Sequence, residues 1–393
     1  MKIAIITRGF TGSTLPLAKQ MVEDGHTVHF YIICNRMILD DIEALECNFK
    51  ANRLGVSSIP NSAISGIREY MGDLNHFSVY CVRFVRPYQN VPYVGRVMDT
   101  INKLLTKNAI SQINGQKYDL VNIVGGYYSS EYNLFLDKLN KKPIVSLHEV
   151  CDHFAPKFDQ PSSFLSKCFK EKIPLVIYSE NTYKDILKYK DVNPKLIHRI
   201  NFGMFTSFQT IQGDNSLVLP RKYILFFGTL KKYKGLNILL EAITKYEVLP
   251  DDTKCVVAGA GNDESFDQMT KDDRFFCIKK RLSNSELVRL ISESIFVVCP
   301  YLTMSQSGIP QTVFVFNKPI VASNLDGFKE ILDESNSLLF NTADSEDLSS
   351  KIRRLLADEI LYRDLIEGII KLRDCEFSPY SWTYIAKQYY KLV

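Results

Sequence analysis

Short apolar runs alternate with amphipathic stretches along almost the whole of the 393-residue chain. The apolar runs have strand length and end at glycine or polar residues, whereas the stretches between them repeat apolar residues at helical spacing. This alternation predicts parallel sheets that are covered by helices on both faces. The expected strands are residues 3–6, 28–33, 120–124, 144–147 and 175–178 in the first half, and 223–227, 254–258, 296–299 and 319–322 in the second. The expected helices include residues 15–23, 236–246 and 285–293.

The pattern forms two separate series, and the polar stretch 209–215 between them is the expected linker. A chain of this length suits two domains, because single domains rarely exceed about 250 residues. The expected fold class is therefore α/β, with two Rossmann-like, doubly wound parallel-sheet domains that face each other across a cleft. We place these domains at residues 1–205 and 206–378.

Composition and charge exclude several classes of protein. Lys and Arg number 48 against 44 Asp and Glu, so the chain lacks the strongly basic field of a general nucleic-acid binder. The charge is unevenly divided, with a net +6 in residues 1–200 and a net −2 in residues 201–393. The nine cysteines are odd in number and include no CxxC pair, so neither a disulfide framework nor a structural zinc site is indicated.

The N-terminal apolar run ends after four residues, before Arg8. A signal peptide needs about 7–15 apolar residues and a spanning helix about 20. We find neither in the chain and expect a reduced, cytoplasmic protein.

Three loops that follow strands in the second half carry candidate chemistry, because parallel sheets bind ligands beyond the carboxyl ends of their strands. In the first loop Gly228 ends a strand, and Lys231, Lys232 and Lys234 follow before a helix opens at Gly235. Lysines and free amides at this position suit a phosphate or diphosphate. A solvated lysine-rich turn explains the run equally simply.

The second loop is a Gly-x-Gly turn at Gly259 and Gly261, which lets backbone approach a ligand closely or simply turns the chain. It has no third glycine at the dinucleotide-binding spacing, and the chain contains no P-loop motif. The third loop, residues 299–311, places Ser307 or Gly308 before Pro310, as in a capped helix whose amides hold an anion. A capped core helix without a ligand is the alternative, and the run 312–316 has strand propensity.

In their order and spacing, these motifs resemble the retaining glycosyltransferases of family 4, which have the GT-B fold. The resemblance in the second half covers about 150 residues and is carried by Gly228 with Lys234-Gly235, Gly259 and Gly261, Ser-x-x-Glu-Leu at 283–287, Pro300-Tyr301, Lys-Pro-Ile-Val-Ala-Ser at 318–323 and residues 326–330. A weaker match in the first half includes Gly9, Gly12, Gly25-His26, residues 118–121 and 145–148, and the entry to the linker at 201–204. In this family the C-terminal helix, here 379–393, packs back on the first domain.

The resemblance implies a nucleotide-sugar donor on the second domain and an acceptor on the first. Lys234 is then a catalytic residue that neutralises the leaving diphosphate together with backbone amides, and no divalent metal or other cofactor is expected. His148 is the second implied catalytic residue, a cleft histidine that contacts the transferred sugar; a satisfied buried histidine is the alternative. The implied donor-binding residues are Gly12, Gly228, Thr229, Lys231, Gly259, Gly261, Arg281, Leu282, Ser305, Gln306, Ser307, Gly308, Ile309 and Glu330.

The chain departs from the family pattern at two places. Thr229 stands where the family has an arginine, and Lys231 or Lys232 can replace that arginine only as a point charge. The paired glutamates of the family fall by spacing on Met304 and Thr312. The sequence Ser-Gln-Ser-Gly at 305–308 is similar to a subgroup that keeps the phosphate loop without those acids.

Residues 83–117 are rich in Arg and Lys, with Asp99 as their one acid. Within them apolar residues recur at helical spacing between 94 and 105. We expect an amphipathic helix that packs its apolar face on the first sheet. The alternative is a basic surface that contacts anionic phospholipid, on the inner face of the membrane.

The first functional hypothesis is a glycosyltransferase that moves a sugar from a nucleotide-sugar to a glycan or lipid-linked acceptor in cell-surface polysaccharide or glycolipid assembly, with retention. A nucleotide-sugar epimerase or hydrolase on the same fold is the second. The third is a non-catalytic nucleotide-sugar-binding protein that kept the fold without the glutamates. No nucleic-acid partner is expected.

Overall fold

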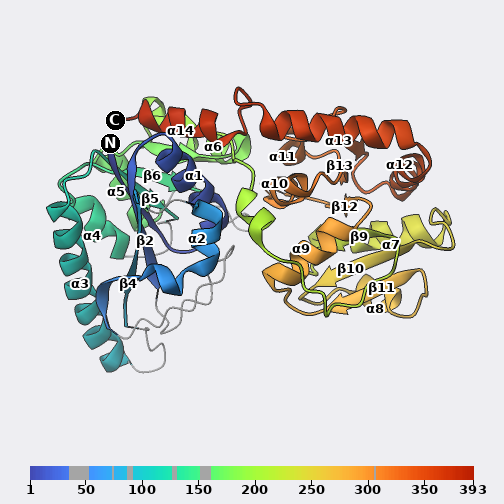
Figure 1. The fold of residues 1–393 in the computed structure, drawn as a ribbon, viewed down its shortest axis with the longest axis horizontal. Helices are drawn as coiled ribbons and strands as arrows, with labels where there is room; N and C mark the ends of the chain where they lie inside the picture. The colour runs from blue at the N-terminus through green and yellow to red at the C-terminus, as the bar shows by residue number, and fades with distance from the viewer. Residues whose placement is uncertain (35–52, 73–74, 86–91, 126–130, 151–160, 305–306) are drawn as a thin grey trace. The chain divides into compact units, whose positions relative to one another are not determined.

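A computed structural model describes residues 1–34, 53–72, 75–85, 92–125, 131–150, 161–304 and 307–393. The chain folds into two compact units. The N-terminal unit consists of Met1–Gly203 together with Trp382–Val393, and the C-terminal unit consists of Met204–Ser381 (Figure 1).

The described strands of the N-terminal unit form one sheet in the order β3-β4-β2-β1-β5-β6-β7-β8. Their bounds are β1 Lys2–Thr7, β2 Thr27–Cys34, β3 Gly55–Ser58, β4 Phe77–Arg83, β5 Leu120–Val124, β6 Ile144–Leu147, β7 Leu175–Ile177 and β8 Ile197–Arg199. Neighbouring strands are parallel, with Ile5 opposite Phe30 on β2 and Asn122 on β5, except that β3 pairs antiparallel with β4 at the edge. The central strands are apolar and buried because helices cover both faces.

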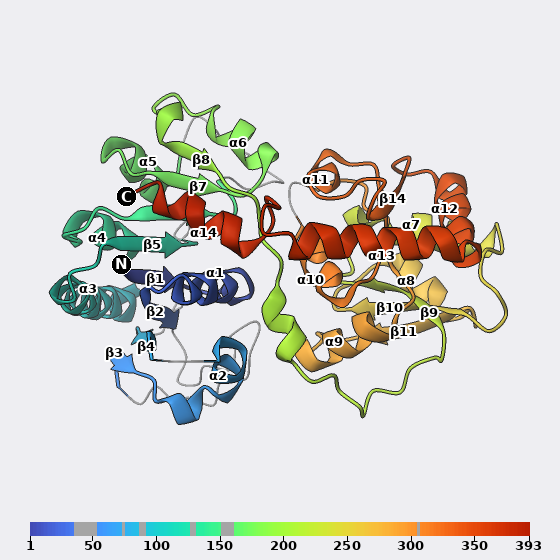
Figure 2. The same ribbon diagram turned by 45° about the horizontal axis from the view of Figure 1, so that its top comes forward.

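Helices of the N-terminal unit cover both faces of this sheet (Figure 2). They are α1 Thr11–Glu23, α2 Ser65–Met71, α3 Pro92–Gly115, α4 Glu131–Lys138, α5 Ser163–Lys170, α6 Glu180–Ile186 and α14 Trp382–Tyr390, with short 3-10 turns at η1 Asn61–Ala63 and η2 Pro194–Leu196. Alternate strand residues such as Val121 and Val145 pack in one core with α3, α4 and α5. On the opposite face the Tyr389 hydroxyl of α14 bonds Ser146 Oγ at 2.9 Å and the Tyr178 hydroxyl at 3.0 Å.

The C-terminal unit contains a sheet of parallel strands in the order β11-β10-β9-β12-β13-β14. The bounds are β9 Tyr223–Phe227, β10 Lys254–Gly259, β11 Phe275–Lys279, β12 Val297–Cys299, β13 Ile320–Ser323 and β14 Ser337–Phe340. This is the doubly wound order of a Rossmann-like domain, in which the direction of strand addition reverses between β9 and β12. A ligand is expected at that reversal, beyond the carboxyl ends of the two strands.

The helices of the C-terminal unit are α7 Leu236–Thr244, α8 Glu264–Met269, α9 Asn284–Glu293, α10 Ile309–Val313, α11 Asp326–Lys329, α12 Ser345–Ala357 and α13 Glu359–Asp374, with 3-10 turns at η3 Thr206–Thr210, η4 Lys232–Lys234 and η5 Phe314–Phe316 (Figure 1). The run 312–316 is therefore helical despite its strand propensity. It continues from Pro310, whose fixed φ suits the first turn of a helix.

The stretch 209–215 is not a linker, because it packs within the C-terminal unit. The Gln209 side chain donates to the Val315 carbonyl at 2.9 Å, and the Asp214 amide donates to the Ser285 carbonyl at 3.1 Å. The chain instead passes from the N-terminal unit to the C-terminal unit between Gly203 and Met204, and it returns between Ser381 and Trp382.

The orientation expected for the helix at 94–105 holds for Leu105, which packs against the core of the sheet, but is wrong for three other apolar side chains. Val97, Ile101 and Leu104 of α3 are exposed, whereas Asn102 and Thr106 are buried against the unit. Asn102 occupies the inner face because its amide bonds both backbone groups of Val85, at 2.8 Å to the nitrogen and 3.1 Å to the oxygen.

Candidate functional site

Backbone hydrogen bonds join three loops at the carboxyl edge of the C-terminal sheet. The Leu230 amide after β9 donates to the Ala260 carbonyl after β10 at 2.8 Å. The Leu302 amide after β12 donates to the Tyr233 carbonyl, also at 2.8 Å. The loops that sequence analysis singled out separately thus form one surface at the strand-order reversal.

The glycines of these loops are required by close backbone packing. A methyl group on Gly259 would overlap the carbonyl oxygen of Gly228, and one on Gly235 would overlap that of Pro300. Gly228 and Gly261 also have φ values of 133° and 134°, which side chains rarely adopt. The Gly-x-Gly turn therefore fits one loop against another, a role that its sequence does not distinguish from contact with a ligand.

Lys234 differs from the other lysines of its loop, because Lys231 and Lys232 are exposed and Lys234 is partly buried. Its Nζ lies 3.7 Å from the centroid of the Tyr301 ring after β12 and 5.0 Å from that of Tyr233. Burial, with a smaller effect of Lys231, lowers the pKa of Lys234 to about 8. The ammonium group thus reaches from the β9 loop to the β12 loop, at the reversal point.

The segment after β12 begins α10 much as expected. Gly308 directly precedes the helix, Pro310 stands in its first turn, and Ser307 Oγ accepts from the Ile309 amide at 3.3 Å. Ser305 and Gln306 lie outside the described residues. Thr312, at one of the two expected glutamate positions, donates its hydroxyl to the Gly308 carbonyl at 2.9 Å.

Arg281 and Leu282 follow β11, at the far end of the same edge. Arg281 is exposed, and the Ser-x-x-Glu motif beyond it forms a capping box in which Ser283 and Glu286 bond each other's backbone amides. On the other side of the reversal, Glu330 ends α11 after β13, and its carbonyl accepts from the Tyr380 hydroxyl. Thr229 is exposed in the β9 loop.

In the N-terminal unit, His148 directly follows β6 and lies in an aromatic cluster. The Phe10 ring stacks on the imidazole with centroids 3.9 Å apart and planes 8° apart, and Tyr178 and Phe202 approach at 4.9 and 5.1 Å. Burial lowers the pKa of His148 to about 3, so the ring is neutral at neutral pH. Its Nε2 has no hydrogen-bond partner among the described residues.

The cluster stands where the strand order of the N-terminal sheet reverses, between β1 and β5. Phe10 follows β1 in the left-handed conformation, with φ 57°, and Gly12 lies in the first turn of α1. Gly125 ends β5, where a methyl group would lie 2.7 Å from the Phe10 ring. Gly12 and His148 therefore share one sheet edge, and those other expected residues that the structure describes share the equivalent edge of the C-terminal unit.

Sequence reasoning missed two side chains of these sites, Phe10 and Tyr301. Tyr301 was part of the Pro-Tyr motif, but nothing local indicated that its ring would lie against Lys234. Phe10 stands between two glycines in the loop after the first strand, where a large apolar residue is unexpected. An aromatic residue between glycines in a loop after a strand could have indicated that its ring lies at the sheet edge.

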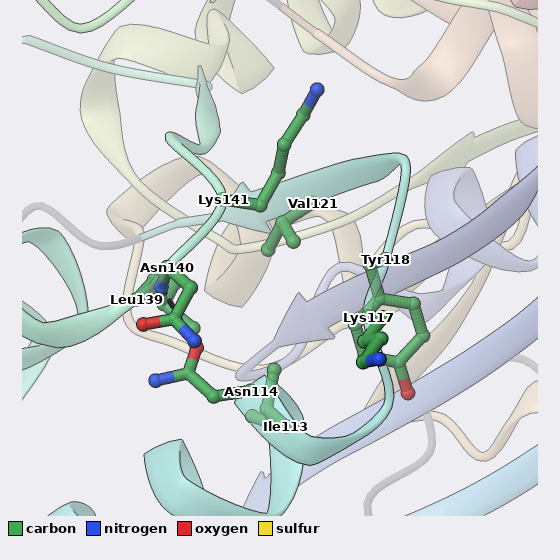
Figure 3. A pocket seen from close by; sticks show the side chains of 8 residues that line it. All are labelled: Ile113, Asn114, Lys117, Tyr118, Val121, Leu139, Asn140 and Lys141. Carbon is green, nitrogen blue, oxygen red and sulfur yellow. Dashed lines mark hydrogen bonds between the residues drawn. The ribbon is translucent and has the colours of Figure 1, made fainter.

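One cavity of about 300 Å³ lies away from both sites. It opens between the end of α3, the start of β5 and the loop after α4, and Lys117, Tyr118 and Lys141 are among its lining residues (Figure 3). This is the amino edge of the sheet, opposite the edge where parallel sheets bind ligands. The Asn114 side chain in its wall already donates to the Lys138 carbonyl and accepts from the Asn140 amide, so we do not assign the cavity to the candidate site.

Comparison with solved structures identifies the architecture. The chain matches Anabaena Alr3699/HepE in complex with UDP and glucose with a TM-score of 0.65 and 13% identity, covering 100% of this chain and 99% of that one. The fold is GT-B. Sucrose-phosphate synthase from Thermosynechococcus elongatus (TM-score 0.62, 13% identity) and an E. coli trehalose-6-phosphate structure bound with UDP-2-fluoro glucose (0.64, 8%) match over 100% of this chain and 98% of theirs. The expected fold class is confirmed.

Residues 221–358 of this GT-B chain match the family model described as Glycosyl transferases group 1. This confirms, at the level of the domain, the expected enzyme class of glycosyltransferase. A curated relative, alpha-maltose-1-phosphate synthase from Mycolicibacterium smegmatis, is 22% identical over 58% of this chain. The match spans 65% of that relative's length.

Two further properties bear on ligands and membranes. No cluster of His, Cys, Asp or Glu among the described residues has the arrangement of a metal site. Within the same described residues, no helix is long and apolar enough to cross a membrane.

Proposed function

We propose that this chain is a glycosyltransferase of the family 4 type, which transfers a sugar from a nucleoside-diphosphate sugar with retention of configuration. The observation that carries the proposal is the position of Lys234, whose Nζ lies over Tyr301 where β9 and β12 meet. A diphosphate bound there would pair with the Lys234 ammonium group in surroundings that exclude part of the water, where one charge stabilises another more strongly than in bulk water. The matching glycosyl transferases domain supports the same enzyme class.

The donor would lie along the carboxyl edge of the C-terminal sheet. Its nucleobase would lie near Arg281 and Leu282, and its diphosphate near Lys234 and the amides of Gly308 and Ile309. The strand order supports this arrangement, because β11 lies at the far end of the edge from the β9–β12 reversal. In the reaction the bond between the anomeric carbon and the diphosphate oxygen breaks, and the electron pair leaves with the nucleoside diphosphate. The acceptor oxygen bonds the anomeric carbon on the same face, and its proton passes to the departing phosphate oxygen.

His148 would contact a hydroxyl group of the transferred sugar. Its low pKa keeps the imidazole neutral, so it can accept or donate one hydrogen bond but adds no charge. The stacked Phe10 ring fixes the orientation of the imidazole. Because Lys234 and amides supply the positive charge, we propose that the donor binds without a divalent metal.

The acceptor would be a glycan or a lipid-linked sugar of the cell surface, bound on the N-terminal unit, in polysaccharide or glycolipid assembly. A hydroxyl group is the only chemistry that the reaction requires of the acceptor. The inner face of the membrane is the place where a lipid-linked acceptor would be met.

A nucleotide panel tests the proposal. UDP, GDP and ADP, each with EDTA present, are added to the full chain and its melting temperature is recorded. We expect one nucleotide to raise the melting temperature, Lys234→Met to remove most of the shift, and the exposed-lysine control Lys232→Met to keep it. No shift with any nucleotide or nucleotide-sugar would overturn the proposal.

Product analysis separates the alternatives. Incubation with the stabilising nucleotide-sugar and a cell-envelope extract is expected to yield a glycosylated product whose anomeric configuration matches the donor. Turnover of the donor alone to an epimer or a free sugar would show an epimerase or hydrolase. Binding without any turnover would show a non-catalytic protein.

A further inference from the structure

The outermost line of helix α3 is apolar. Val97, Ile101 and Leu104 recur at helical spacing, and their side chains are 51%, 36% and 60% exposed. On the opposite side Asn102, Thr106, Ala109 and Ile113 face the unit and are buried. The later turns of the helix therefore bury apolar residues in the usual way. Over residues 97–106 the apolar line faces outward while Asn102 and Thr106 face inward, which is the reverse of the usual arrangement.

The Asn102 side chain fixes this orientation, because it bonds both backbone groups of Val85 beyond β4. Thr106 satisfies its hydroxyl within the helix, since Oγ1 donates to the Asn102 carbonyl at 2.7 Å. Rotation of α3 to bury Leu104 would break both bonds of Asn102 and leave the half-buried backbone groups of Val85 without these partners. The exposed apolar line is therefore built into the unit.

Basic residues flank the apolar line on one side. Arg96, Lys103 and Lys107 are exposed and fall together on the helix surface, next to Val97 and Leu104. Asp99 is the one acidic residue of the helix after residue 95. We call the six residues Arg96, Val97, Ile101, Lys103, Leu104 and Lys107 the α3 patch.

The apolar surface continues onto the neighbouring strand. Helix α3 packs beside β3 (Figure 2), and a methyl group on Gly55 would lie 3.7 Å from Leu105. The preceding residue, Leu54, is 45% exposed, and Arg53 before it is also exposed. The two residues directly before β3 thus repeat the combination of an exposed leucine with a basic residue.

The position of the patch along the helix connects it with the candidate site of this unit. Helix α3 runs from the end of β4, at the carboxyl edge of the sheet, to the start of β5, at the amino edge. Residues 96–107 make up half of the 24-residue helix and begin after its first turn. The patch therefore begins at the edge where the His148 cluster lies.

We propose that the α3 patch docks the protein on a membrane surface that contains anionic phospholipid. The apolar line would enter the boundary between headgroups and acyl chains, while Arg96, Lys103 and Lys107 bind phosphate groups beside it. The charge favours this occupant over a second copy of the chain. A two-fold interface that pairs α3 antiparallel with its copy would bring like-charged flanks together, whereas an anionic bilayer complements them.

The test is sedimentation of the full chain with vesicles of phosphatidylcholine alone or of phosphatidylcholine with phosphatidylglycerol. No donor or acceptor is needed, so the result does not depend on the proposed activity. We expect binding to the anionic vesicles that weakens with added salt. The triple variant R96Q/K103Q/K107Q should bind on the order of 100-fold more weakly, because each basic residue contributes about a fivefold factor.

A second triple variant, V97Q/I101Q/L104Q, should lose at least about tenfold in affinity without loss of stability, because its side chains are exposed. The matched controls are K271Q/R363Q/K371Q and V218Q/I360Q/I370Q, which change exposed residues of the C-terminal unit and should bind like the wild type. Melting temperature verifies folding, and light scattering records the oligomeric state.

Equal binding by both α3 triple variants and the wild type would overturn the proposal. So would a wild-type dimer that V97Q/I101Q/L104Q converts to a monomer, since the patch would then be a protein interface. Equal binding to vesicles with and without phosphatidylglycerol would overturn the claim that the patch recognises anionic phospholipid.

Discussion

The partly buried ammonium group of Lys234 should make nucleotide binding depend on pH in a defined direction. Burial lowers the pKa of Lys234 to about 8 from an ordinary value of 10.5. Below that pH the free protein carries the charge that a diphosphate requires. Above it the lysine is largely neutral, so binding must be accompanied by uptake of a proton, and the affinity falls as the pH rises.

The size of the effect follows from the linkage between the proton and the ligand. Each pH unit above about 8 should lower the affinity for the nucleoside diphosphate up to tenfold, until the pKa of Lys234 in the complex is reached. Between about pH 7 and pH 10 we therefore expect a loss approaching 100-fold. Isothermal titration calorimetry with the stabilising nucleotide measures it, and repetition in buffers of different ionisation enthalpy counts the protons taken up.

Two variants separate Lys234 from other titrating groups. Lys234→Arg carries a charge that persists over this range, so its affinity should be nearly independent of pH even where the geometry is poorer. Lys234→Met should be weak and equally independent of pH, whereas Lys232→Met should retain the wild-type profile. A wild-type affinity that is constant over this range, or a profile unchanged in Lys234→Met, would refute the reasoning.

Two further predictions concern stability. Gly259→Ala should destabilise the C-terminal unit by about 3 kcal/mol in urea unfolding, because its methyl group would overlap the Gly228 carbonyl; Gly115→Ala, which meets no atom within 4 Å, should cost nothing. Burial lowers the pKa of His29 to about 4 and that of His148 to about 3, so the unfolded chain binds more protons than the native protein below about pH 6.5. As the pH is lowered from about 6.5 to about 4, the free energy of unfolding should decrease by up to about 1.4 kcal/mol per pH unit for each histidine. His148→Gln should make this decrease smaller.

Nine of the fourteen described strands were expected from the sequence, because they are continuous apolar runs; the other five, β3, β4, β8, β11 and β14, were not expected. Residues 120–124, 144–147 and 223–227 were expected as strands and are strands with those bounds. Strands that are buried on both faces have no polar alternation to confuse the pattern. The helix after Gly308 was harder to predict, because Val313–Phe316 reads as a strand by propensity and becomes helical through packing.

The orientation of α3 could not be predicted from periodicity. Its apolar residues define one face of a helix, and the ordinary rule buries that face. The rule fails because Asn102 finds a partner in the backbone of Val85, 17 residues earlier in the chain. The sequence shows the asparagine without its partner.

The candidate sites were predictable by position and only partly by side chain. The loops after β9, β10 and β12 follow from the strand order, because strand ends on each side of a reversal point meet there. The contact between Lys234 and Tyr301 joins residues of two such loops, and so does that between Phe10 and His148. Pairs of this kind depend on rotamers and loop geometry, which no local pattern records.

Net charge would not predict the diphosphate site that we propose on the C-terminal unit. The half of the chain with charge −2 holds Lys234, whereas the half with +6 presents the neutral, apolar cluster of His148 and Phe10 at its sheet edge. Exposed charges are screened by water and salt, so Lys232 acts weakly at a distance. One ammonium group held in partly dry surroundings acts strongly at short range, and its lowered pKa measures the cost of holding it there. A diphosphate would remove that cost by supplying the missing counter-charge, which is why binding and proton uptake should be coupled at this lysine.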